Sequence, residues 1–418
     1  MASESPENHP KRWKWRAEWL AYTFIETIAG RLPGPLVFRA GELLGGIAWH
    51  FMPLRRRIVL RNLRIAFHGE YDLPTLRRMA RETVRRTGAN LFSSARTARL
   101  SGERIDAVLT VENQDLVGKS MSGGGGLVLM PAHMGNWEIL SRMNRWFPQG
   151  RKIGAFYRPL NNPLLNARVV AQRETDGTRL FSKRDSLHQV TGFLRESGII
   201  GILADQRVGR QGVPVRFFGR LTRASPLPSL MGRRSKSEVL TMSLITEAPG
   251  KWRVRYYPVK RPFKTADCME ALERAMKASP LDVFWLQERW KVYISPQHAI
   301  RDWLGPETPG AGKPHRALLW LAGAPGSWRL PEEWAHPDVI YETVLAPGQE
   351  KPAWLPGSGI IHTAPSTGDR DLLRESIAAI DLAAALPVDY ILTCNAPKGL
   401  AKAARREAIP LVSLPPPP

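Results

Sequence analysis

The sequence contains little cysteine. Only Cys268 and Cys394 are present among 418 residues, which excludes a disulfide framework and a cysteine-rich metal site. Sparse cysteine is typical of proteins in a reducing compartment. The first residues also lack the charged start, apolar stretch and small-residue cleavage site of an export signal. We therefore expect a protein of a reducing compartment.

Long hydrophobic runs are absent as well. A membrane-spanning helix needs ~20 mostly apolar residues, whereas the longest uncharged run near the N-terminus, 43–54, is shorter than that. Tryptophan and basic residues alternate at 11–16, a mixture that suits the lipid headgroup layer. We expect residues 1–54 to form membrane-anchoring helices that lie in one leaflet. A tilted span and an ordinary buried helix pair remain open alternatives.

Acidic residues are scarce relative to basic ones. The chain has 60 Lys and Arg against 38 Asp and Glu, a net charge of +22. Residues 301–418 hold 11 basic and 13 acidic residues, so the whole excess lies in the first 300. Such a surface attracts polyanions: nucleic acid, anionic lipid, phosphorylated substrates or an acidic carrier protein. Charge alone does not choose among these four.

A basic helical stretch follows the N-terminal segment. Taken together and next to a membrane-seeking segment, its arginines indicate contact with an anionic surface. For any single one, a solvated helix face is the simpler interpretation. No helix-turn-helix, zinc-finger or RNA-binding signature is present, so we expect no nucleic-acid partner. The arginines are Arg55, Arg56, Arg57, Arg61, Arg64, Arg77, Arg78, Arg81, Arg85 and Arg86.

An α/β pattern begins near residue 108. Short apolar runs predict strands, and amphipathic stretches between them predict helices, which favours a largely parallel sheet flanked by helices. We expect one domain over 55–300. The strands are expected at 127–130, 152–157, 199–204, 239–245 and 252–259, and the helices at 163–174, 186–197 and 267–279. The glycine run at 123–126 is a turn, because no phosphate-loop Lys-Ser or Lys-Thr follows it.

A second, smaller α/β pattern occupies the C-terminal quarter. Residues 301–315 are rich in proline and glycine and predict a linker. Beyond it, residues 316–418 predict a small α/β module whose role is open. Its strands are expected at 317–321, 339–344, 359–363, 389–393 and 410–414, with helices near 369–386 and 398–407.

The chemically informative segment directly follows the strand expected at 127–130. His133 and Glu138 are five residues apart, so on one continuous helix they would point ~140° away from each other. They meet if His133 precedes a helix and Glu138 lies in its first turn, with Gly135 permitting the bend. A histidine held by a carboxylate is a general base. A loop histidine with a purely structural role is the alternative for a histidine considered alone.

The sequence lacks the residues for a serine nucleophile and for a metal site beside His133. No Gly-x-Ser-x-Gly nucleophile motif is present, which favours direct attack by a substrate hydroxyl over an acyl-enzyme. No further histidine or cysteine lies near His133 and Glu138, so we expect no metal site there.

Several sequence blocks resemble the bacterial lipid A biosynthesis acyltransferases, the lauroyl and myristoyl transferases of the lysophospholipid acyltransferase superfamily. The similarity covers roughly residues 15–295, and the blocks occur in the order that the family shows. They are RNLRIAF at 61–67, HMGNWE at 133–138, YRPLNNP at 157–163, ADQ at 204–206, FFG at 217–219 and FWLQERWK at 284–291. The resemblance implies a sheet like that of glycerol-3-phosphate acyltransferases.

The same resemblance implies roles for individual residues. His133 would take the proton from the acceptor hydroxyl, and Glu138 would orient it. Arg173 would bind a phosphate or the developing oxyanion, and Asp205 would hold that arginine or the helix beneath it. The expected substrate contacts are Asn136, Arg158 and Gln206. No cofactor is implied.

The implied reaction is O-acyl transfer from a thioester of acyl carrier protein, or of coenzyme A, to a hydroxyl of a phosphorylated glycolipid such as a lipid A precursor. The implied location is the cytoplasmic face of the bacterial inner membrane. Two departures leave specificity open: Gln287 and Glu288 stand where the family usually has a histidine, and 221–236 is rich in Arg and Ser. Alternatives are another acceptor (a phosphatidylinositol mannoside or an aminolipid) and a non-catalytic protein that binds membranes or nucleic acid through its basic surface.

Overall fold

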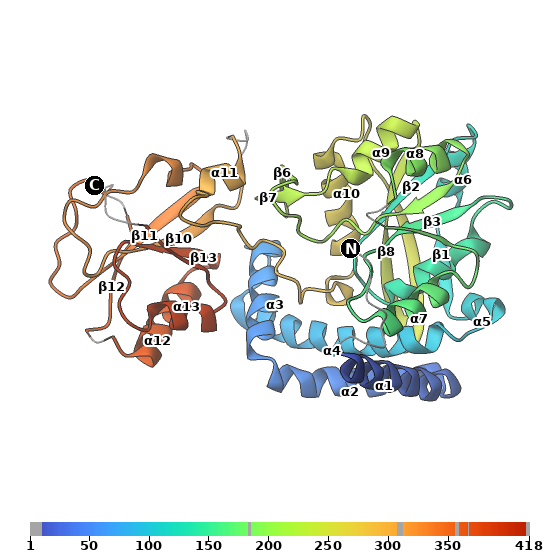
Figure 1. Cartoon of the computed structure of the whole chain (residues 1–418), viewed down its shortest axis with the longest axis horizontal. Coiled ribbons are helices and arrows are strands. Elements are labelled where there is room, and N and C mark those ends of the chain that lie inside the picture. The colour runs from blue at the N-terminus through green and yellow to red at the C-terminus, as the bar shows by residue number, and fades with distance from the viewer. Residues whose placement is uncertain (1–10, 183–184, 307–311, 356–358, 367, 415–418) are drawn as a thin grey trace. The chain divides into compact units, whose positions relative to one another are not determined.

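The computed structural model describes residues 11–182, 185–306, 312–355, 359–366 and 368–414. Part of the predicted linker at 301–315 therefore lies outside the described residues. The chain folds as two compact units, each built from several stretches of sequence (Figure 1). The first unit comprises 1–50, 82–205 and 226–284. The second comprises 51–81, 206–225 and 285–418.

A seven-stranded sheet forms the centre of the first unit. Its order is β1-β9-β8-β2-β5-β3-β4, and every pairing is parallel except that of β8 with β9. This confirms the mostly parallel sheet predicted from the sequence. The strands are β1 Leu109–Glu112, β2 Leu127–Pro131, β3 Ile153–Phe156, β4 Arg179–Phe181, β5 Ile199–Gly201, β8 Glu238–Ala248 and β9 Lys251–Pro258.

Helices surround this sheet. β2 is buried along its whole length, as expected for a central strand covered on both faces. The helices are α1 Arg12–Arg31, α2 Gly34–Phe51, α4 Leu73–Thr97, α5 Gly102–Asp106, α6 Asp115–Met121, η1 Trp137–Trp146, α7 Pro163–Arg173, α8 Leu187–Arg195, α9 Leu227–Ser235, α10 Thr265–Lys277 and η2 Pro280–Asp282. Of α4, residues 82–97 belong to this unit.

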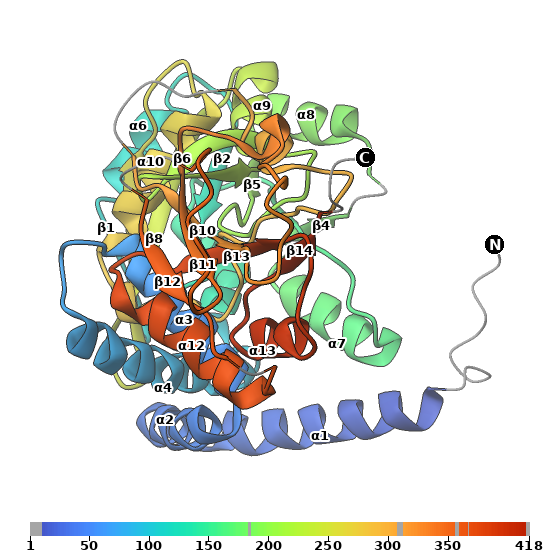
Figure 2. The same ribbon diagram turned by 90° about the vertical axis from the view of Figure 1, so that its left-hand side faces the viewer.

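The N-terminal helices α1 and α2 bury acidic side chains and expose many large apolar ones. Glu26 is 1% exposed and binds both Arg168 of α7 and Arg99. Large apolar side chains form an outward apolar face: Trp13, Leu20, Phe24, Ile25, Ile28, Leu32, Leu36, Leu43, Leu44 and Ile47. Figure 2 shows α1 running alongside α7. Val37 and Phe38 are buried as well, so α2 is apolar on both of its sides. Within the described residues, no helix is long and apolar enough to cross a bilayer.

Glycines bring α2 against α4. A Cβ at Gly41 would lie 2.6 Å from the carbonyl oxygen of Gly88, and one at Gly45 would lie 2.6 Å from that of Val84. Any larger side chain would push the two backbones apart. The small residues at 41, 45 and 88 therefore set the close approach of these helices.

The second unit contains a five-stranded, fully parallel sheet of order β12-β11-β10-β13-β14. Alternate residues of β10 face opposite sides of it, so Leu318 and Trp320 pack with α12 and α13 while Ala317 and Leu319 pack with α11. The elements are α3 Pro53–Ala66, β6 Val213–Phe217, β7 Arg220–Ala224, α11 Ile300–Leu304, β10 His315–Trp320, η3 Glu332–Trp334, β11 Val339–Leu345, β12 Ile361–Thr363, α12 Arg370–Ala383, β13 Val388–Thr393, α13 Leu400–Arg406 and β14 Leu411–Ser413.

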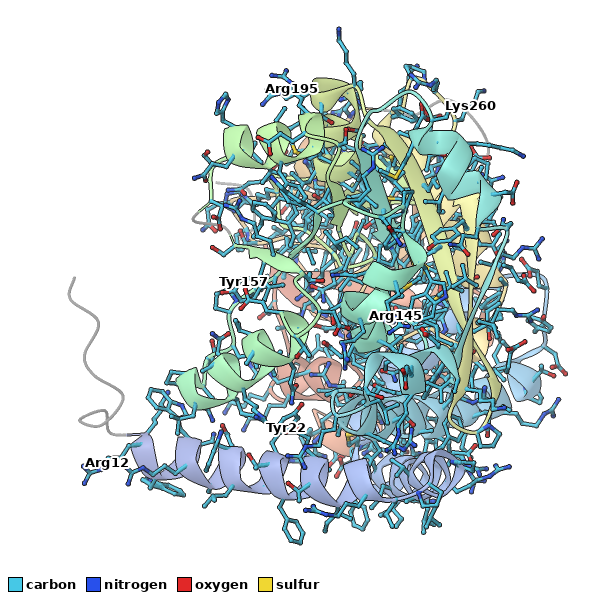
Figure 3. The ribbon with its side chains drawn as sticks, turned by 90° about the vertical axis from the view of Figure 1, so that its right-hand side faces the viewer. Arg12, Tyr22, Arg145, Tyr157, Arg195 and Lys260 are labelled. Carbon is cyan, nitrogen blue, oxygen red and sulfur yellow. The ribbon has the colours of Figure 1, made fainter. Side chains whose placement is uncertain are left out.

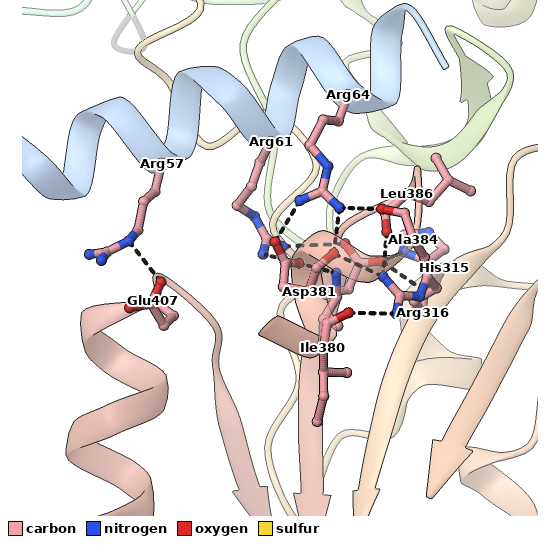
Figure 4. A network of polar contacts seen from close by, with 12 residues as sticks. Arg57, Arg61, Arg64, His315, Arg316, Ile380, Asp381, Ala384, Leu386 and Glu407 are labelled. Carbon is pink, nitrogen blue, oxygen red and sulfur yellow. Dashed lines mark hydrogen bonds and ion pairs between the residues drawn. The ribbon is translucent and has the colours of Figure 1, made fainter. Parts of the chain in front are cut away.

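Arginines of α3 are bound to acidic residues of the C-terminal module (Figure 4). Arg64 is buried and donates to Asp381 Oδ2 at 2.5 Å and to the carbonyl oxygen of Ala384 at 2.7 Å. Arg61 lies 3.7 Å from Asp389, and Arg57 lies 2.8 Å from Glu407. These three arginines belong to the basic stretch predicted to contact an anionic surface. The structure instead places them in ion pairs inside the second unit.

Asp389 lies at the centre of this ion-pair network. It is almost fully buried and accepts from Arg220, which has no exposed surface, and from Nδ1 of His315 at 3.1 Å. Burial alone would raise the pKa of Asp389, but the charges of Arg220 and His315 outweigh burial and lower it to about 2. Burial also lowers the pKa of Arg220 to about 10. The module is therefore fixed to α3 and β7 by buried charges that depend on each other.

Replacing Asp389 by Asn keeps the shape of the side chain but leaves Arg220 and His315 without a counter-charge. We expect the second unit to lose ~3–5 kcal/mol of unfolding free energy, the cost of breaking a buried pair. The loss is measured by unfolding the full chain in urea and monitoring hydrogen exchange of the β10 and β13 amides, which report on the second unit. The control Asp371→Asn removes an exposed charge paired with Arg370 and Arg406 and is expected to cost ~0–1 kcal/mol.

The pH dependence provides a second readout. The folded pKa of Asp389 is about 2, below the ~3.9 of an unfolded aspartate. Its stabilisation is therefore complete above about pH 4 and is lost as the pH falls from about 4 towards 2. Asp389→Asn should remove this part of the acid sensitivity. Equal stability of Asp389→Asn and Asp371→Asn would contradict this role of the network.

Candidate active site

The pairing of β2 with β5 brings His133 and Asp205 together. The two strands are parallel, with Leu129 opposite Gly201. The ladder continues past their ends, since the amide of Ala204 donates to the carbonyl oxygen of Pro131 at 3.4 Å. Counting on in this register places residue 133 level with residue 205. Both therefore emerge at the carboxyl end of the sheet, where open α/β sheets form their sites.

His133 and Asp205 form a buried dyad. Nδ1 of His133 lies 2.5 Å from Oδ1 of Asp205, and the Asp205 side chain has no exposed surface. An ionised carboxylate only accepts hydrogen bonds, so it selects the tautomer with the proton on Nδ1. That tautomer places the basic lone pair on Nε2. The carboxylate also stabilises the imidazolium that forms when Nε2 takes up a proton.

The loop after His133 is held in place by its backbone. The carbonyl oxygen of His133 accepts from the amide of Phe284 at 2.8 Å, and the amide of Gly135 donates to the carbonyl oxygen of Asp282 at 2.9 Å. Gly135 has a φ of +55°, and a Cβ there would lie 2.5 Å from the carbonyl oxygen of Leu244. The bend predicted at Gly135 is therefore confirmed. Glu138 lies in the first turn of η1, also as predicted.

Glu138 is bound to Arg173, the last residue of α7. Arg173 Nε lies 2.9 Å from Glu138 Oε2, and its Nη2 lies 2.7 Å from Oε1. The indole of Trp137 also donates to Glu138, at 3.1 Å. Burial lowers the pKa of Arg173, but the hydrogen bond and charge of Glu138 outweigh burial and raise it. The result is a fixed, charged guanidinium beside the loop that carries His133.

The structure pairs these four residues differently from the sequence-based interpretation. The sequence predicted that Glu138 orients His133 and that Asp205 holds Arg173 or a helix. In the structure, Asp205 holds His133 and Glu138 holds Arg173. The physical reason is the strand register, which sets residue 205 opposite residue 133. Five residues of separation along the chain suggested the nearer carboxylate, but sequence spacing carries no information on which strands are neighbours.

The expected substrate contacts lie in different surroundings. Asn136 is buried and donates from Nδ2 to Oγ1 of Thr97 at 3.0 Å. Arg158 follows β3, and its side chain is exposed. Gln206 is also exposed and directly follows Asp205 in the chain. A role in substrate binding stays a prediction for all three.

A cavity lies beside the ion pair, and no pattern in the sequence predicted it. It holds about 760 Å³ of empty space, its open mouth included. Glu138 and Arg173 are part of its wall. Most of the remaining wall comes from apolar residues of the sheet and of η1, among them Leu129, Met143, Phe147, Ile153, Leu203 and Met242. Such a lining suits a hydrocarbon chain.

Comparison with known proteins identifies the family. The sequence model of the family described as bacterial lipid A biosynthesis acyltransferase matches residues 5–292. The chain belongs to this family. The match confirms the resemblance found in the sequence. Membership of the family means that the protein is an acyltransferase in lipid A biosynthesis. Residues 293–418 lie outside the matched range.

Curated relatives agree with the family assignment. A lipid A biosynthesis palmitoleoyltransferase from Escherichia coli (strain K12) is 21% identical over 293 residues, which cover 68% of this chain and 92% of the relative. A lipid A biosynthesis lauroyltransferase from the same organism is 24% identical over 293 residues, covering 68% and 93%. A phosphatidylinositol mannoside acyltransferase from Mycolicibacterium smegmatis is 25% identical over 214 residues, covering 48% and 67%.

Proposed function

We propose that this acyltransferase moves a fatty acyl chain from a thioester donor to a hydroxyl of a phosphorylated glycolipid, and that the acceptor is a lipid A precursor. The observation that carries the proposal is the buried His133–Asp205 dyad at the carboxyl end of the sheet. A base held in this way activates a hydroxyl without a cofactor. A second observation supports it: the Glu138–Arg173 pair lines an apolar cavity.

The dyad accounts for the proton in the transfer. The acceptor oxygen forms a bond to the thioester carbonyl carbon while Nε2 of His133 takes the hydroxyl proton. The carbon–sulfur bond then breaks, and the departing thiolate receives that proton from the imidazolium. Asp205 keeps the imidazole oriented and offsets its transient positive charge. Atoms and charge balance with no further reactant.

Arg173 supplies positive charge at a fixed place. Its guanidinium carries five N–H groups, and two of its nitrogens donate to Glu138. The donors beyond these can stabilise the oxyanion that develops on the thioester carbonyl, or bind a phosphate of a substrate. Glu138 acts here as a positioning residue, because it fixes the guanidinium plane through two parallel hydrogen bonds.

The apolar cavity fits the acyl chain of the donor. Its lining is mostly apolar, and its polar members are Glu138, Ser141, Tyr157, Arg173 and Thr178. A chain bound there would place its thioester near the charged pair. The donor is a thioester of acyl carrier protein or of coenzyme A, and the excess basic charge of the first 300 residues suits either of these anionic carriers.

The outward apolar face of α1 and α2 fits a membrane surface. Burying side chains such as Phe24 in the acyl region, with basic residues at the headgroups, is how an interfacial helix binds an anionic bilayer. We place the enzyme at the cytoplasmic face of the bacterial inner membrane, where such a surface meets a membrane-bound acceptor. The polar inward side of α1 keeps the helix attached to the rest of its unit through Glu26.

A phosphatidylinositol mannoside is the second candidate acceptor, because two mycobacterial phosphatidylinositol mannoside acyltransferases are also similar to the chain. The lipid A relatives match over more of their length, which favours a lipid A precursor. The non-catalytic alternative is set aside by membership of an acyltransferase family.

Replacing His133 by Ala tests the proposed base. Loss of a positioned general base costs ~10²–10⁴-fold in rate, so we expect a loss of this size in transfer of labelled acyl groups. The assay uses acyl carrier protein thioester as donor and a phosphorylated lipid A precursor as acceptor. The control His188→Ala changes an exposed histidine of α8 and should keep full activity. Undiminished transfer by His133→Ala would contradict the proposed chemistry.

Replacing Phe24 by Glu tests the membrane contact. Phe24 is 67% exposed on the outward apolar face, and burial of such a side chain contributes ~1.5–3 kcal/mol. We expect binding to anionic phospholipid vesicles, measured by sedimentation, to weaken about 10- to 100-fold. The control Leu187→Glu alters an exposed apolar residue of α8 and should bind as the wild type does. Equal weakening of vesicle binding by both substitutions would show that the outward apolar face is not the membrane-binding surface.

A further inference from the structure

A second cavity is also lined by the Glu138–Arg173 pair. It holds about 700 Å³ of empty space, its open mouth included. Its wall is formed by residues of α1, α4, η1 and α7, whereas residues of the sheet line the first cavity. Three residues line both cavities: Glu138, Ser141 and Arg173. The charged pair is therefore accessible from two separate spaces.

Helix α1 closes one side of this second cavity through Tyr22. The Tyr22 hydroxyl donates to Oε1 of Gln172 at 3.0 Å, and Figure 3 shows Tyr22 on the side of α1 that faces α7. Further polar contacts hold α1 there, since Asn162 donates to the carbonyl oxygen of Trp15 at 3.0 Å and to Glu18 at 2.9 Å. The outward apolar face lies on the same helix. The second cavity is thus walled by the helix that we place on the membrane.

The second cavity offers many hydrogen-bonding groups. Its wall includes the polar residues Tyr22, Ser94, Thr97, Arg142 and Gln172. The three hydroxyls already donate within the protein, and the Arg142 guanidinium binds Asp176 and two carbonyl oxygens, so their oxygens and the Gln172 amide are the groups left for a ligand. Burial raises the pKa of Tyr22, so its hydroxyl stays protonated and donates. Within the described residues, Nε2 of Gln172 is buried and has no hydrogen-bond partner. A buried amide group of this kind gains a hydrogen bond when a polar ligand enters.

The two cavities therefore suit different ligands. The first is lined mostly by apolar residues and fits an acyl chain. The second combines hydroxyl, amide and guanidinium groups with a few apolar residues, such as Leu91 and Val169. That mixture matches a sugar or other hydroxylated headgroup joined to a hydrophobic tail. Transfer between two substrates requires that both are held at one catalytic centre.

We infer that the cavity between α1, α4, η1 and α7 binds the hydroxylated headgroup of the membrane-lipid acceptor. This inference rests on the proposed acyl transfer and adds the place where the second substrate binds. The acceptor leaves the bilayer along α1, its headgroup makes hydrogen bonds with Tyr22 and Gln172, and its reacting hydroxyl approaches the centre past Arg173. The donor chain occupies the sheet-lined cavity at the same time.

Filling the second cavity tests this assignment. Ser94 lines it from α4, and Ser94→Trp places an indole in the proposed headgroup space. We expect the KM for a phosphorylated lipid A precursor to rise about tenfold or more, with the KM for the acyl carrier protein thioester within about twofold. The control Ser122→Trp adds the same side chain at an exposed position outside both cavities and should change neither constant.

A photo-crosslink provides a measurement that does not depend on Ser94→Trp folding or on catalysis. A benzophenone amino acid replaces Leu160, which is exposed and lines the second cavity. Ultraviolet light should then attach labelled lipid A precursor to the full chain in vesicles, and excess unlabelled precursor should suppress the attachment. The same amino acid at Leu187 on α8, also exposed, is the control and should attach none.

Each outcome decides one question. An unchanged acceptor KM in folded Ser94→Trp, or a rise in the donor KM alone, overturns the inference and leaves the proposed reaction intact. Wild-type enzyme that transfers no acyl group to any lipid acceptor contradicts the proposed reaction. In that case attachment of precursor at residue 160 still supports a lipid headgroup site, and absence of attachment overturns it.

Discussion

The parallel register of β2 and β5 is the constraint on which the site depends. Leu129 opposite Gly201 places His133 level with Asp205, and the buried carboxylate then fixes the tautomer that leaves Nε2 basic. A shift of one residue would turn one of the two side chains to the opposite face of the sheet. Gly135 completes the arrangement, because its positive φ turns the chain into η1 and delivers Glu138 to Arg173.

Charge has different uses in the two units. In the first unit, Glu26 and Glu138 are turned inward and hold α7 to α1 and to η1, so the same helix that carries Arg173 also borders the proposed acceptor site. In the second unit, arginines of α3 and β7 hold the C-terminal sheet through Asp381 and Asp389. Many of the arginines thus form ion pairs within the protein. The basic residues with exposed side chains are the ones available for the proposed contacts with lipid and with a carrier.

The sequence predicted where helices and strands lie better than it predicted which of them are in contact. The buried run at 127–130 and the helix at 163–174 match β2 and α7 because local periodicity and capping determine both. The pairing of His133 with Asp205 depends on strand order, which no local pattern reports. Asp205 looked like a partner for an arginine, and Arg61 and Arg64 looked like surface charges, because their partners lie 72 to more than 300 residues away. Neither cavity could be predicted from the sequence, because the residues that line each one are also far apart in the chain.

A double-mutant cycle on acyl-transfer rates tests the central claim that Asp205 acts through His133. Residues that act as one unit are not additive. The account predicts that Asp205→Ala slows the wild-type enzyme ~10²-fold or more yet adds nothing on a His133→Ala background. It also predicts that Asp205→Ala keeps its full effect on an Arg173→Ala background. The reverse pattern, with additivity at His133 and none at Arg173, would contradict the dyad.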